Sequence, residues 1–346
     1  MTGVQTCALP ISNCNVSKFE GVISPAYVNL RAKNSNVSYY YNYYFKTQYW
    51  AMALFAHGKG VSFENRWTLN NETIMNYFIP VPSQEEQQKI ADYLDEKVFL
   101  LDSIITKTTL SIEEYKKYKQ SLITETVTKG LNPNVEMKDS EIKWIGEIPN
   151  EWDITRVRYC CKLKNGTTPS TSETKYFNGN INWFTPSDFK SNFLLEKPIK
   201  TLSELTITEG IVTLYPKESI LLICIGGTVG KIGYIDKNGY SNQQITALIP
   251  IDIYYKYLLY YLVSITEYIK CNALYTTLPI INISYLNDIP ILTPSKTEQK
   301  QISQYLDQKC TKIDNIITQK QKLLAELESY KKSLIYECVT GKREVI

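Results

Sequence analysis

Two long stretches of this chain place apolar residues at alternating spacings of three and four, as helices that pair with one another do. In the first stretch the spaced positions are Leu101, Ile104, Thr108, Ser111, Tyr115, Tyr118 and Leu122. In the second they are Ile313, Ile316, Lys320, Leu323, Leu327, Tyr330 and Leu334. The spacing predicts two long helices, over residues 83–130 and 294–342, that pair through these side chains as a coiled coil.

Both predicted helices begin with the same capping pattern. Ser83 and Ser295 each follow a proline and stand three residues before a glutamate, Glu86 or Glu298. In a capping box the serine side chain accepts a backbone N–H of the first turn and the glutamate accepts the serine's own N–H. The sequence therefore predicts a capping box at the start of each helix.

The two helical stretches are one sequence written twice. Residues 86–128 align without a gap with residues 298–340, at an offset of 212 positions and with about 20 identities in 43 positions. A solenoid is excluded, because its units repeat roughly every 20 to 50 residues. The duplication predicts a module made of a globular part and a long helix, present twice.

Residues 131–293, between the helices, have the pattern of a mixed or mainly β domain. Short apolar runs cover residues 211–214, 219–225 and 244–251, and turn signals stand at Asn178-Gly179, Gly226-Gly227 and Asn238-Gly239. Runs and turns in this order are typical of strands joined by tight connections. A tyrosine-rich amphipathic stretch, residues 254–261, then precedes the second helix, and residues 39–45 are its version in the first half.

The globular part before the first helix is shorter than the second one. If the two halves were once equal, about 80 residues of the first would precede position 1 of this chain. We therefore expect residues 13–82 to be a partial domain. Residues 1–12 fit poorly with the rest of the chain, and we interpret them as a non-native leader, such as a fusion or a translated sequencing adapter.

Size and charge restrict the possible functions. A chain of 346 residues with 43% apolar and 21% charged residues is expected to form two globular domains. The net charge is only +3, and no segment is strongly basic. If the protein binds nucleic acid, phosphate attraction from this chain alone should be modest, and partner proteins would supply much of the affinity.

The cysteines favour a cytoplasmic protein. The chain has eight cysteines without a CxxC pair, and His57 is its only histidine, so a structural zinc site is not expected. Cysteines scattered through apolar runs are typical of reduced core residues. The longest apolar stretch, residues 245–265, is interrupted by Asp252 and Lys256, so no membrane span is expected.

Enzyme signatures are weak throughout. The segment 226–231 resembles a phosphate-binding loop, but its glycine spacing is wrong and Ile232 stands where serine or threonine must bind Mg²⁺. A tight turn between strands is the better interpretation. With a single histidine, a nucleophilic triad is not expected. Asp188 and Glu196 form too loose an acidic pair to indicate a nuclease.

Several motifs, taken in order, resemble the specificity (S) subunit of Type I restriction-modification systems. They comprise the Trp144–Trp152 stretch and the segments 166–170, 176–183, 227–231 and 241–244, together with the duplicated capped helix; the first half keeps residues 21–28 and the part through Arg66-Trp67. The resemblance covers nearly the whole chain from residue 13. Each motif alone is weak, whereas their order is specific.

This resemblance implies an α+β fold with two mixed α/β target-recognition domains, the first partial, separated by two long antiparallel coiled-coil helices. Each domain of such a subunit reads one half of a bipartite site on double-stranded DNA. The subunit is not catalytic and needs no cofactor. Modification subunits methylate adenine with S-adenosylmethionine, and restriction subunits translocate and cut DNA with ATP and Mg²⁺.

Candidate DNA contacts follow from the chemistry of the side chains within these motifs. The amides of Asn242, Gln243 and Gln244 suit adenine edges, and the other candidates suit phosphates and backbone: Lys164, Lys175, Lys190, Lys231, Thr167, Thr168, Ser170 and Thr228, with Lys59 and Arg66 in the first half. For each of them, a turn residue or a solvated side chain is an equally good interpretation, and Asn242 and Gln243 have the alternative of hydrogen bonds within the domain. The competing function is a coiled-coil adaptor or decayed fragment that binds no DNA and only docks modification subunits.

Overall fold

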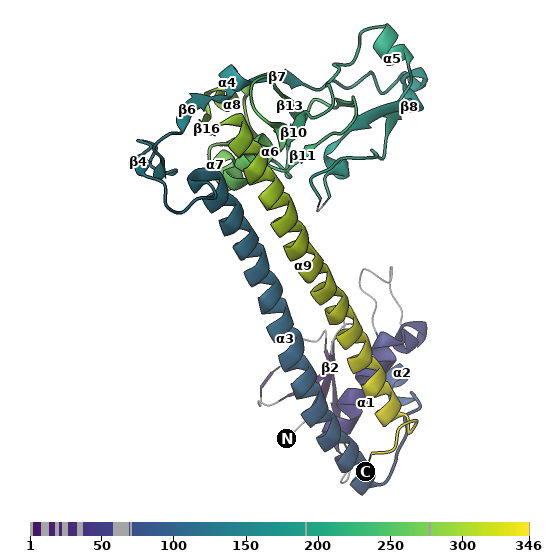
Figure 1. The fold of residues 1–346 in the computed structure, drawn as a ribbon. Coiled ribbons are helices and arrows are strands. Elements are labelled where there is room, and N and C mark those ends of the chain that lie inside the picture. Colours follow the sequence, from purple (N-terminus) through teal and green to yellow (C-terminus); the bar gives the residue numbers. More distant parts are fainter. Residues whose placement is uncertain are drawn as a thin grey trace. The chain divides into compact units, whose positions relative to one another are not determined.

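The computed structural model describes residues 3–7, 14–17, 21–22, 27–32, 37–57, 69, 71–190, 192–275 and 278–345. The chain divides into two compact units (Figure 1). Unit 1 is Met1–Glu114 with Ile316–Ile346, and unit 2 is Tyr115–Asn315. Each unit therefore contains one globular part and a portion of both long helices. Within the described ranges, no helix has the length and apolarity that crossing a membrane requires.

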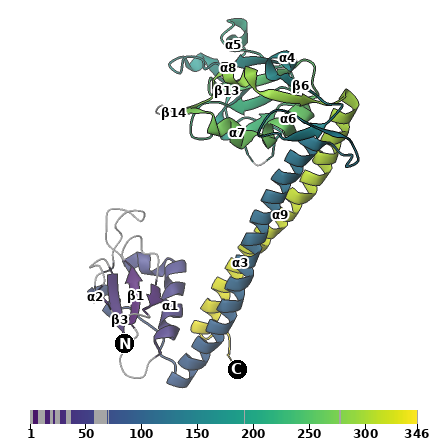
Figure 2. The ribbon, with the colours of Figure 1, turned by 90° about the vertical axis from the view of Figure 1, so that its left-hand side faces the viewer.

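The two predicted long helices are present with nearly the predicted limits. Helix α3 is Gln84–Lys129 and α9 is Lys296–Val339. Within each unit their portions run antiparallel (Figure 2). In unit 2, for example, Lys119 of α3 lies at Asp314 of α9, while Gly130, just after α3, lies against Glu298 in the first turn of α9.

The caps at the two helix starts differ. At α3 the predicted box is complete, because the Ser83 N–H donates to the Glu86 carboxylate at 3.0 Å and the Glu86 N–H donates to the Ser83 hydroxyl at 3.3 Å. At α9 the Glu298 N–H donates to the Ser295 hydroxyl at 3.3 Å, but the Glu298 carboxylate accepts the indole N–H of Trp152 at 3.0 Å. The second capping box is thus only half formed, because the Glu298 carboxylate bonds to Trp152 instead of to the Ser295 N–H.

Alternate positions of the predicted helix seam are wrong by one residue. Leu101, Ile313 and Leu334 are buried as expected, and Tyr115, Leu122, Ile316 and Leu327 are partly buried. Ile104, Tyr118, Leu323 and Tyr330, however, are 38% to 56% exposed. In α3 Thr108 is buried as expected, whereas Ile105 is partly buried and Ile112 is buried, each one position after the predicted Ile104 and Ser111. The first step of the buried seam, from Leu101 to Ile105, is therefore four residues long and not three.

Unit 2 is built on a four-stranded antiparallel sheet in the order β11-β10-β13-β7. These strands are β7 (Cys161–Asn165), β10 (Ile220–Ile223), β11 (Ile232–Tyr234) and β13 (Ile245–Pro250). Both faces are covered. Leu222 and Leu248 pack into the core that includes helix α6 (Tyr255–Ser264), while Leu221 and Ala247 pack with Phe184 of the second sheet.

The second sheet of unit 2 has the order β12-β8-β9, with β8 (Phe177–Phe184), β9 (Thr201–Leu202) and β12 (Tyr240–Ser241). Two predictions fail here. Residues 211–214 form no strand, and Asn178-Gly179 lies inside β8, where the pairing with β9 shifts register. Asn178 has a φ of 61°, so its turn signal produces an irregularity within a strand instead of ending one.

The remaining elements of unit 2 are short. They are β4 (Met137–Asp139), β5 (Glu147–Pro149), β6 (Asp153–Arg156), α4 (Val157–Cys160), η2 (Thr174–Tyr176), η3 (Pro186–Asp188), α5 (Leu205–Thr208), α7 (Thr266–Cys271), β14 (Leu274–Tyr275), β15 (Pro279–Ile280), α8 (Ile283–Asp288) and β16 (Pro290–Thr293). Strand β16 pairs antiparallel with β6 and leads directly into α9.

Unit 1 has a three-stranded sheet in the order β2-β1-β3. Its elements are β1 (Gly3–Cys7), β2 (Cys14–Val16), β3 (Tyr27–Arg31), α1 (Ser38–Trp50), η1 (Ala53–His57) and α2 (Asn71–Met75). The central strand, β1, lies within residues 1–12, which the sequence predicts to be non-native. Strand pairing describes conformation only, so the origin of this segment stays a prediction.

The duplication extends beyond the long helices. In unit 1 Val4 pairs with Val16 and Gly3 with Arg31, and 217 positions later Leu221 pairs with Gly233 and Ile220 with Leu248. Strands β2, β1 and β3 therefore correspond to β11, β10 and β13, in the same register.

The tyrosine-rich helices, α1 and α6, also dock in the same way. The Tyr43 hydroxyl donates to Asp95 of α3 at 2.6 Å, and the Tyr260 hydroxyl donates to Asp307 of α9 at 2.8 Å. Each half thus attaches its globular part to its long helix through the same buried tyrosine.

Candidate nucleic-acid interface

Three loops of unit 2 meet at the ends of its central strands. They are residues 166–172 after β7, residues 225–231 between β10 and β11, and residues 241–244 before β13. The Thr168 hydroxyl donates to the side-chain carbonyl of Gln243, and the Gln244 amide donates to the backbone carbonyl of Ile225 at 3.4 Å. These contacts join the three loops into one continuous surface, which we call the polar ridge.

Gly166 makes the close approach of two of these loops possible. Its N–H donates to the carbonyl of Ile245 at 3.0 Å, and the Thr167 N–H donates to the carbonyl of Ser241 at 2.9 Å. A Cβ at position 166 would overlap the backbone oxygens of Ser241 and Asn242. Glycine is therefore required where the ridge crosses over the strand ends.

Two buried aromatic residues support the ridge from below. The Trp183 indole donates to the carbonyl of Thr167 at 3.1 Å, and the hydroxyls of Tyr215 and Ser241 lie 3.1 Å apart. Burial raises the pKa of Tyr215 to about 12, so its hydroxyl stays protonated at neutral pH. Trp183 thus holds the backbone of one ridge loop, and Tyr215 holds a side chain of another.

The glycine-rich turn 226–231 is a connection between antiparallel strands, as the sequence predicts. Gly226 and Gly230 have φ values of 105° and 88°, which favour glycine. Strand β11 follows the turn directly. A phosphate-binding loop would open a helix instead, so the turn is not a site of that class.

The three candidate amides have different roles. Asn242 is buried and bonds internally: its amide donates to the Gln244 side chain at 2.9 Å, and its carbonyl accepts the Gln244 N–H at 3.2 Å. The Asn242 side chain therefore hydrogen-bonds within the domain, which is the alternative to a contact with DNA. Gln243 is exposed, and among the described residues its side chain is engaged only through its carbonyl, by the Thr168 hydroxyl. Of the three candidate amides, Gln243 is thus the one whose side-chain N–H groups make no hydrogen bond within the described part of the chain.

Of the candidate cations, Lys231 belongs to the ridge. Together with Thr228 and Lys270 of α7 it lines a pocket of about 300 Å³ beside the turn. Lys270 also pairs with Glu267 at 2.8 Å, whereas the described part of the chain provides no ion-pair partner for Lys231. Lys270 was missed by sequence reasoning, because it lies on another element and no motif joins it to the turn.

The other candidate residues do not line this pocket. Lys164 is half-buried on β7, where it pairs with Ala247, and Ser170 shares a 2.7 Å hydrogen bond with Ser172. Lys175 belongs to η2, lying 3.9 Å from Glu173 and over the Tyr176 ring. Lys190 is exposed after η3. Lys59 and Arg66 fall outside the described residues.

The loose acidic pair has a structural explanation. One carboxylate oxygen of Asp188 accepts the N–H of Thr185 at 2.7 Å, and the other accepts the N–H of Ile199 at 2.7 Å. Asp188 thus caps η3 and fixes the following loop. Across the ranges that the structure describes, histidine, cysteine and acidic side chains form no group able to hold a metal ion.

The chain is similar in sequence to known proteins. The chain is 31% identical over 195 residues to the MjaIX specificity subunit, a Type I restriction enzyme subunit of Methanocaldococcus jannaschii, covering 54% of this chain and 43% of that protein. It is 28% identical over 348 residues to the MjaVIII specificity subunit of the same organism, covering 94% and 75%. The chain thus spans less than half of the first relative and three quarters of the second.

Solved structures show the same fold. A chain from work on complex assembly and conformational transition of the type I R-M system superposes with a TM-score of 0.77 at 17% identity, covering 97% of this chain and 81% of that one. A family model described as Type I restriction modification DNA specificity domain matches residues 6–114 and 149–329. Since these residues make up most of both globular parts and both long helices, the chain belongs to the Type I restriction modification DNA specificity family.

Proposed function

We propose that this chain is the DNA-binding specificity subunit of a Type I restriction-modification complex, and that unit 2 reads one half of a bipartite site on double-stranded DNA. The observation that carries the proposal is the polar ridge. Sequence is read by donors and acceptors that reach base edges, and phosphates are bound by cations. The ridge presents both, through the Gln243 amide and the Lys231 ammonium group.

In this proposal the chain recognises DNA and does no chemistry. Methyl transfer from S-adenosylmethionine belongs to modification subunits, and ATP- and Mg²⁺-dependent translocation and cleavage belong to restriction subunits. The complex would act in the cytoplasm, where the buried thiols of Cys224 and Cys310 stay reduced.

The long helices supply the docking surface for modification subunits. Several large apolar side chains on them are exposed in the isolated chain: Phe99, Leu100, Leu110, Tyr118, Leu323 and Tyr330. Exposed apolar side chains along a helix favour a protein partner over water. The seam positions that the sequence wrongly assigned to helix pairing are thus available to a second protein.

Selection from a random duplex library tests the proposal. The purified chain, alone and together with its modification subunits, is incubated with the pool at physiological salt, and bound DNA is sequenced. We expect one enriched half-site motif. Gln243→Ala should broaden that motif, because it removes the amide donors that would contact a base edge. Gln321→Ala, at an exposed position of α9, is the matched control and should leave the motif unchanged.

The adaptor alternative predicts a different result. A chain that only docks subunits would enrich no motif with or without its partners, yet would still co-purify with them. If the Gln243→Ala variant enriches the same motif equally strongly, the chain still binds DNA, but the polar ridge is not the surface that reads the sequence.

A further inference from the structure

The glycine-rich turn of unit 2 has two backbone donors without a partner among the described residues. Gly227 and Thr228 are exposed and line the pocket of about 300 Å³ beside the turn. Their N–H groups donate to no group in the described part of the chain, whereas those of Gly226, Val229 and Gly230 are bonded within the domain. Successive free N–H groups in a turn form a concavity that favours an anion.

Hydrogen bonds and packing hold the turn in place. The Gly226 N–H donates to the carbonyl of Pro279 at 3.1 Å, and the Gly230 N–H donates to the carbonyl of Ile223 at 2.9 Å. Val229 is buried and packs into the main core of unit 2. Donors that are fixed before a ligand arrives lose little conformational freedom when it binds. The two free N–H groups are therefore ready to accept a ligand without rearrangement of the turn.

Two lysines line the same pocket from different elements. Lys231 follows the turn and Lys270 belongs to α7, and the described residues that line the pocket include no acid. The Lys270 side chain lies along the turn, because a Cβ at position 230 would lie 2.7 Å from its Cε and 2.8 Å from its Cγ. The absence of a side chain at Gly230 therefore allows Lys270 to reach the pocket.

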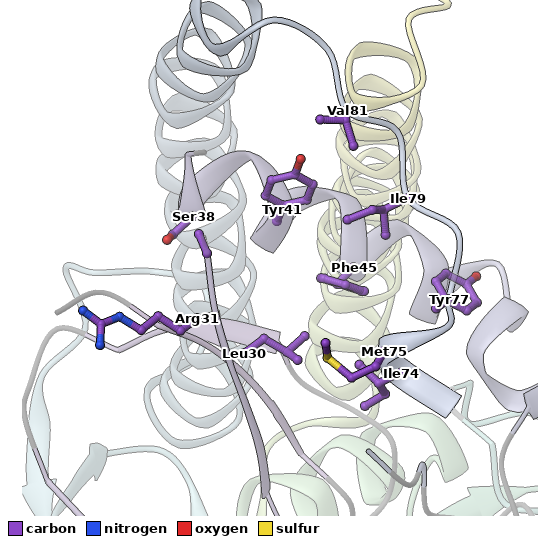
Figure 3. Close-up of a pocket in the computed structure, with 11 residues that line it drawn as sticks. Leu30, Arg31, Ser38, Tyr41, Phe45, Ile74, Met75, Tyr77, Ile79 and Val81 are labelled. Atoms are coloured by element: carbon purple, nitrogen blue, oxygen red, sulfur yellow. The ribbon is translucent and has the colours of Figure 1, made fainter. Parts of the chain in front are cut away.

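This lining differs from that of a pocket of similar volume in unit 1. The pocket in unit 1 measures about 290 Å³, and its walls are mainly apolar, with Leu30, Phe45, Met75 and Ile79 among them (Figure 3). Arg31 is the one cation among its described lining residues. An apolar wall offers an anion no hydrogen bonds to replace those that it makes with water. Of these two pockets, the one in unit 2 is therefore suited to an anion.

One carboxylate competes for the ammonium group of Lys270. Glu267, three residues earlier on α7, accepts this group at 2.8 Å, and the Glu267 side chain is 82% exposed. An ion pair between exposed groups contributes little, so Lys270 can turn to another anion at small cost. Helix α7 itself is held in place, since Tyr268 stacks on Trp144 with the ring centroids 4.7 Å apart and Ile269 is fully buried.

We propose that Lys231, Lys270 and the two free N–H groups of the turn together bind one phosphate group, and that this group belongs to the DNA backbone of the half-site. The assignment to DNA rests on the proposed function. A phosphate contact fixes the position of a protein on the duplex without reading a base. Because the Gln244 amide donates to the carbonyl of Ile225, the turn is joined to the loop that carries Gln243. The bound phosphate therefore sets the register in which Gln243 meets base edges.

Neutral methylphosphonates, placed one at a time along a duplex that the chain selects, test whether the two lysines share a phosphate. Fluorescence anisotropy gives the affinity of the full chain and of its Lys231→Ala and Lys270→Ala variants. We expect each substitution to weaken binding of the unmodified duplex about tenfold, as the loss of one charge-assisted hydrogen bond does. At one methylphosphonate position, the same for both lysines, neither substitution should weaken binding further. Lys322→Ala, at an exposed lysine that also pairs with a glutamate of its own helix, should leave the affinity unchanged.

Inorganic phosphate tests the same site without DNA. Compared with chloride at equal ionic strength, it should shift the amide NMR signals of Gly227 and Thr228, and Lys270→Ala should weaken this response. Absence of the shift would overturn the site. Coupling of the two lysines to different phosphates of the duplex would overturn it too, as would unchanged affinity of the Lys270→Ala variant, and both results leave the proposed function standing. A chain that binds inorganic phosphate here but selects no DNA would overturn the DNA backbone as the source, and the proposed function with it.

Discussion

Lys119 of α3 donates to both carboxylate oxygens of Asp314 of α9, each at 2.7 Å. The duplication repeats this ion pair with the helices exchanged, since Lys331 of α9 donates to Asp102 of α3 at 2.5 Å. Two copies of one sequence give reciprocal pairs of this kind only when they pair antiparallel, because residue i then meets j as j meets i. Each unit contains one of the two pairs, so the antiparallel pairing is encoded in the repeat itself.

Charge reversal at this pair should be destabilising and reversible. Asp314→Lys places two lysines together, and we expect a loss of about 1 kcal/mol in the free energy of unfolding, the upper range for partly exposed pairs. Adding Lys119→Asp should recover most of the loss. Urea unfolding measures both. Glu326→Lys, in a solvated pair within α9, is the control and should change stability by less than about 0.5 kcal/mol. A double variant no more stable than Asp314→Lys alone would contradict the pairing.

The buried Tyr215 predicts alkaline destabilisation of unit 2. Burial raises its pKa in the folded state to about 12 from the ordinary tyrosine value of 10.0. Its contribution to stability is complete below pH 10 and is lost as the pH rises from 10 towards 12, because the unfolded chain releases the phenolic proton first. Unfolding followed by circular dichroism across this range should show the decline. Tyr215→Phe should make it shallower, whereas Tyr159→Phe, at an exposed tyrosine, should not.

The two equivalent glutamates at the helix starts should titrate apart. Hydrogen bonds from Ser83 lower the pKa of Glu86, whereas desolvation raises the pKa of Glu298. Above the pKa of the unfolded chain, Glu86 therefore adds stability that is lost as the pH falls through its lowered pKa. Glu298 has the opposite sign, and its protonated form stabilises the fold at acidic pH. Carbon-detected NMR of labelled glutamate should give the lower pKa for Glu86, and equal values would refute the difference in caps.

The long helices were predictable because local signals agree. Ser83 and Ser295 mark the helix starts, and the observed limits differ from the predicted ones by a few residues. Which residues of the seam are buried was not predictable. Ile104 and Ile105 are adjacent, and a helix of about 3.6 residues per turn permits a step of either three or four residues after Leu101. Only packing against the partner helix decides which of the two is buried.

The candidate site was predictable in part. The sequence motifs contain Thr168, Gln243 and Lys231, which the fold brings into one ridge. They do not show that the Asn242 side chain hydrogen-bonds within its own loop. That role depends on the position of Gln244, which follows from the strand register. Lys270 belongs to a distant helix, so only the tertiary fold places it beside the turn.

Lys231 should contribute to affinity and not to sequence choice. An ammonium group on a flexible stem binds phosphate as a point charge, and each phosphate neutralised contributes about 0.9 to the slope of log K against log salt concentration. We expect Lys231→Ala to weaken binding of all duplexes to a similar degree and to reduce the slope by about one, while the preferred motif is retained. Lys312→Ala, at an exposed position of α9 in unit 2, should leave the slope unchanged. Anisotropy titrations between about 50 and 200 mM salt, across which affinity from phosphate contacts falls steeply, measure both. An unchanged slope for the Lys231→Ala variant would show that the glycine-rich turn is not part of the DNA-binding surface.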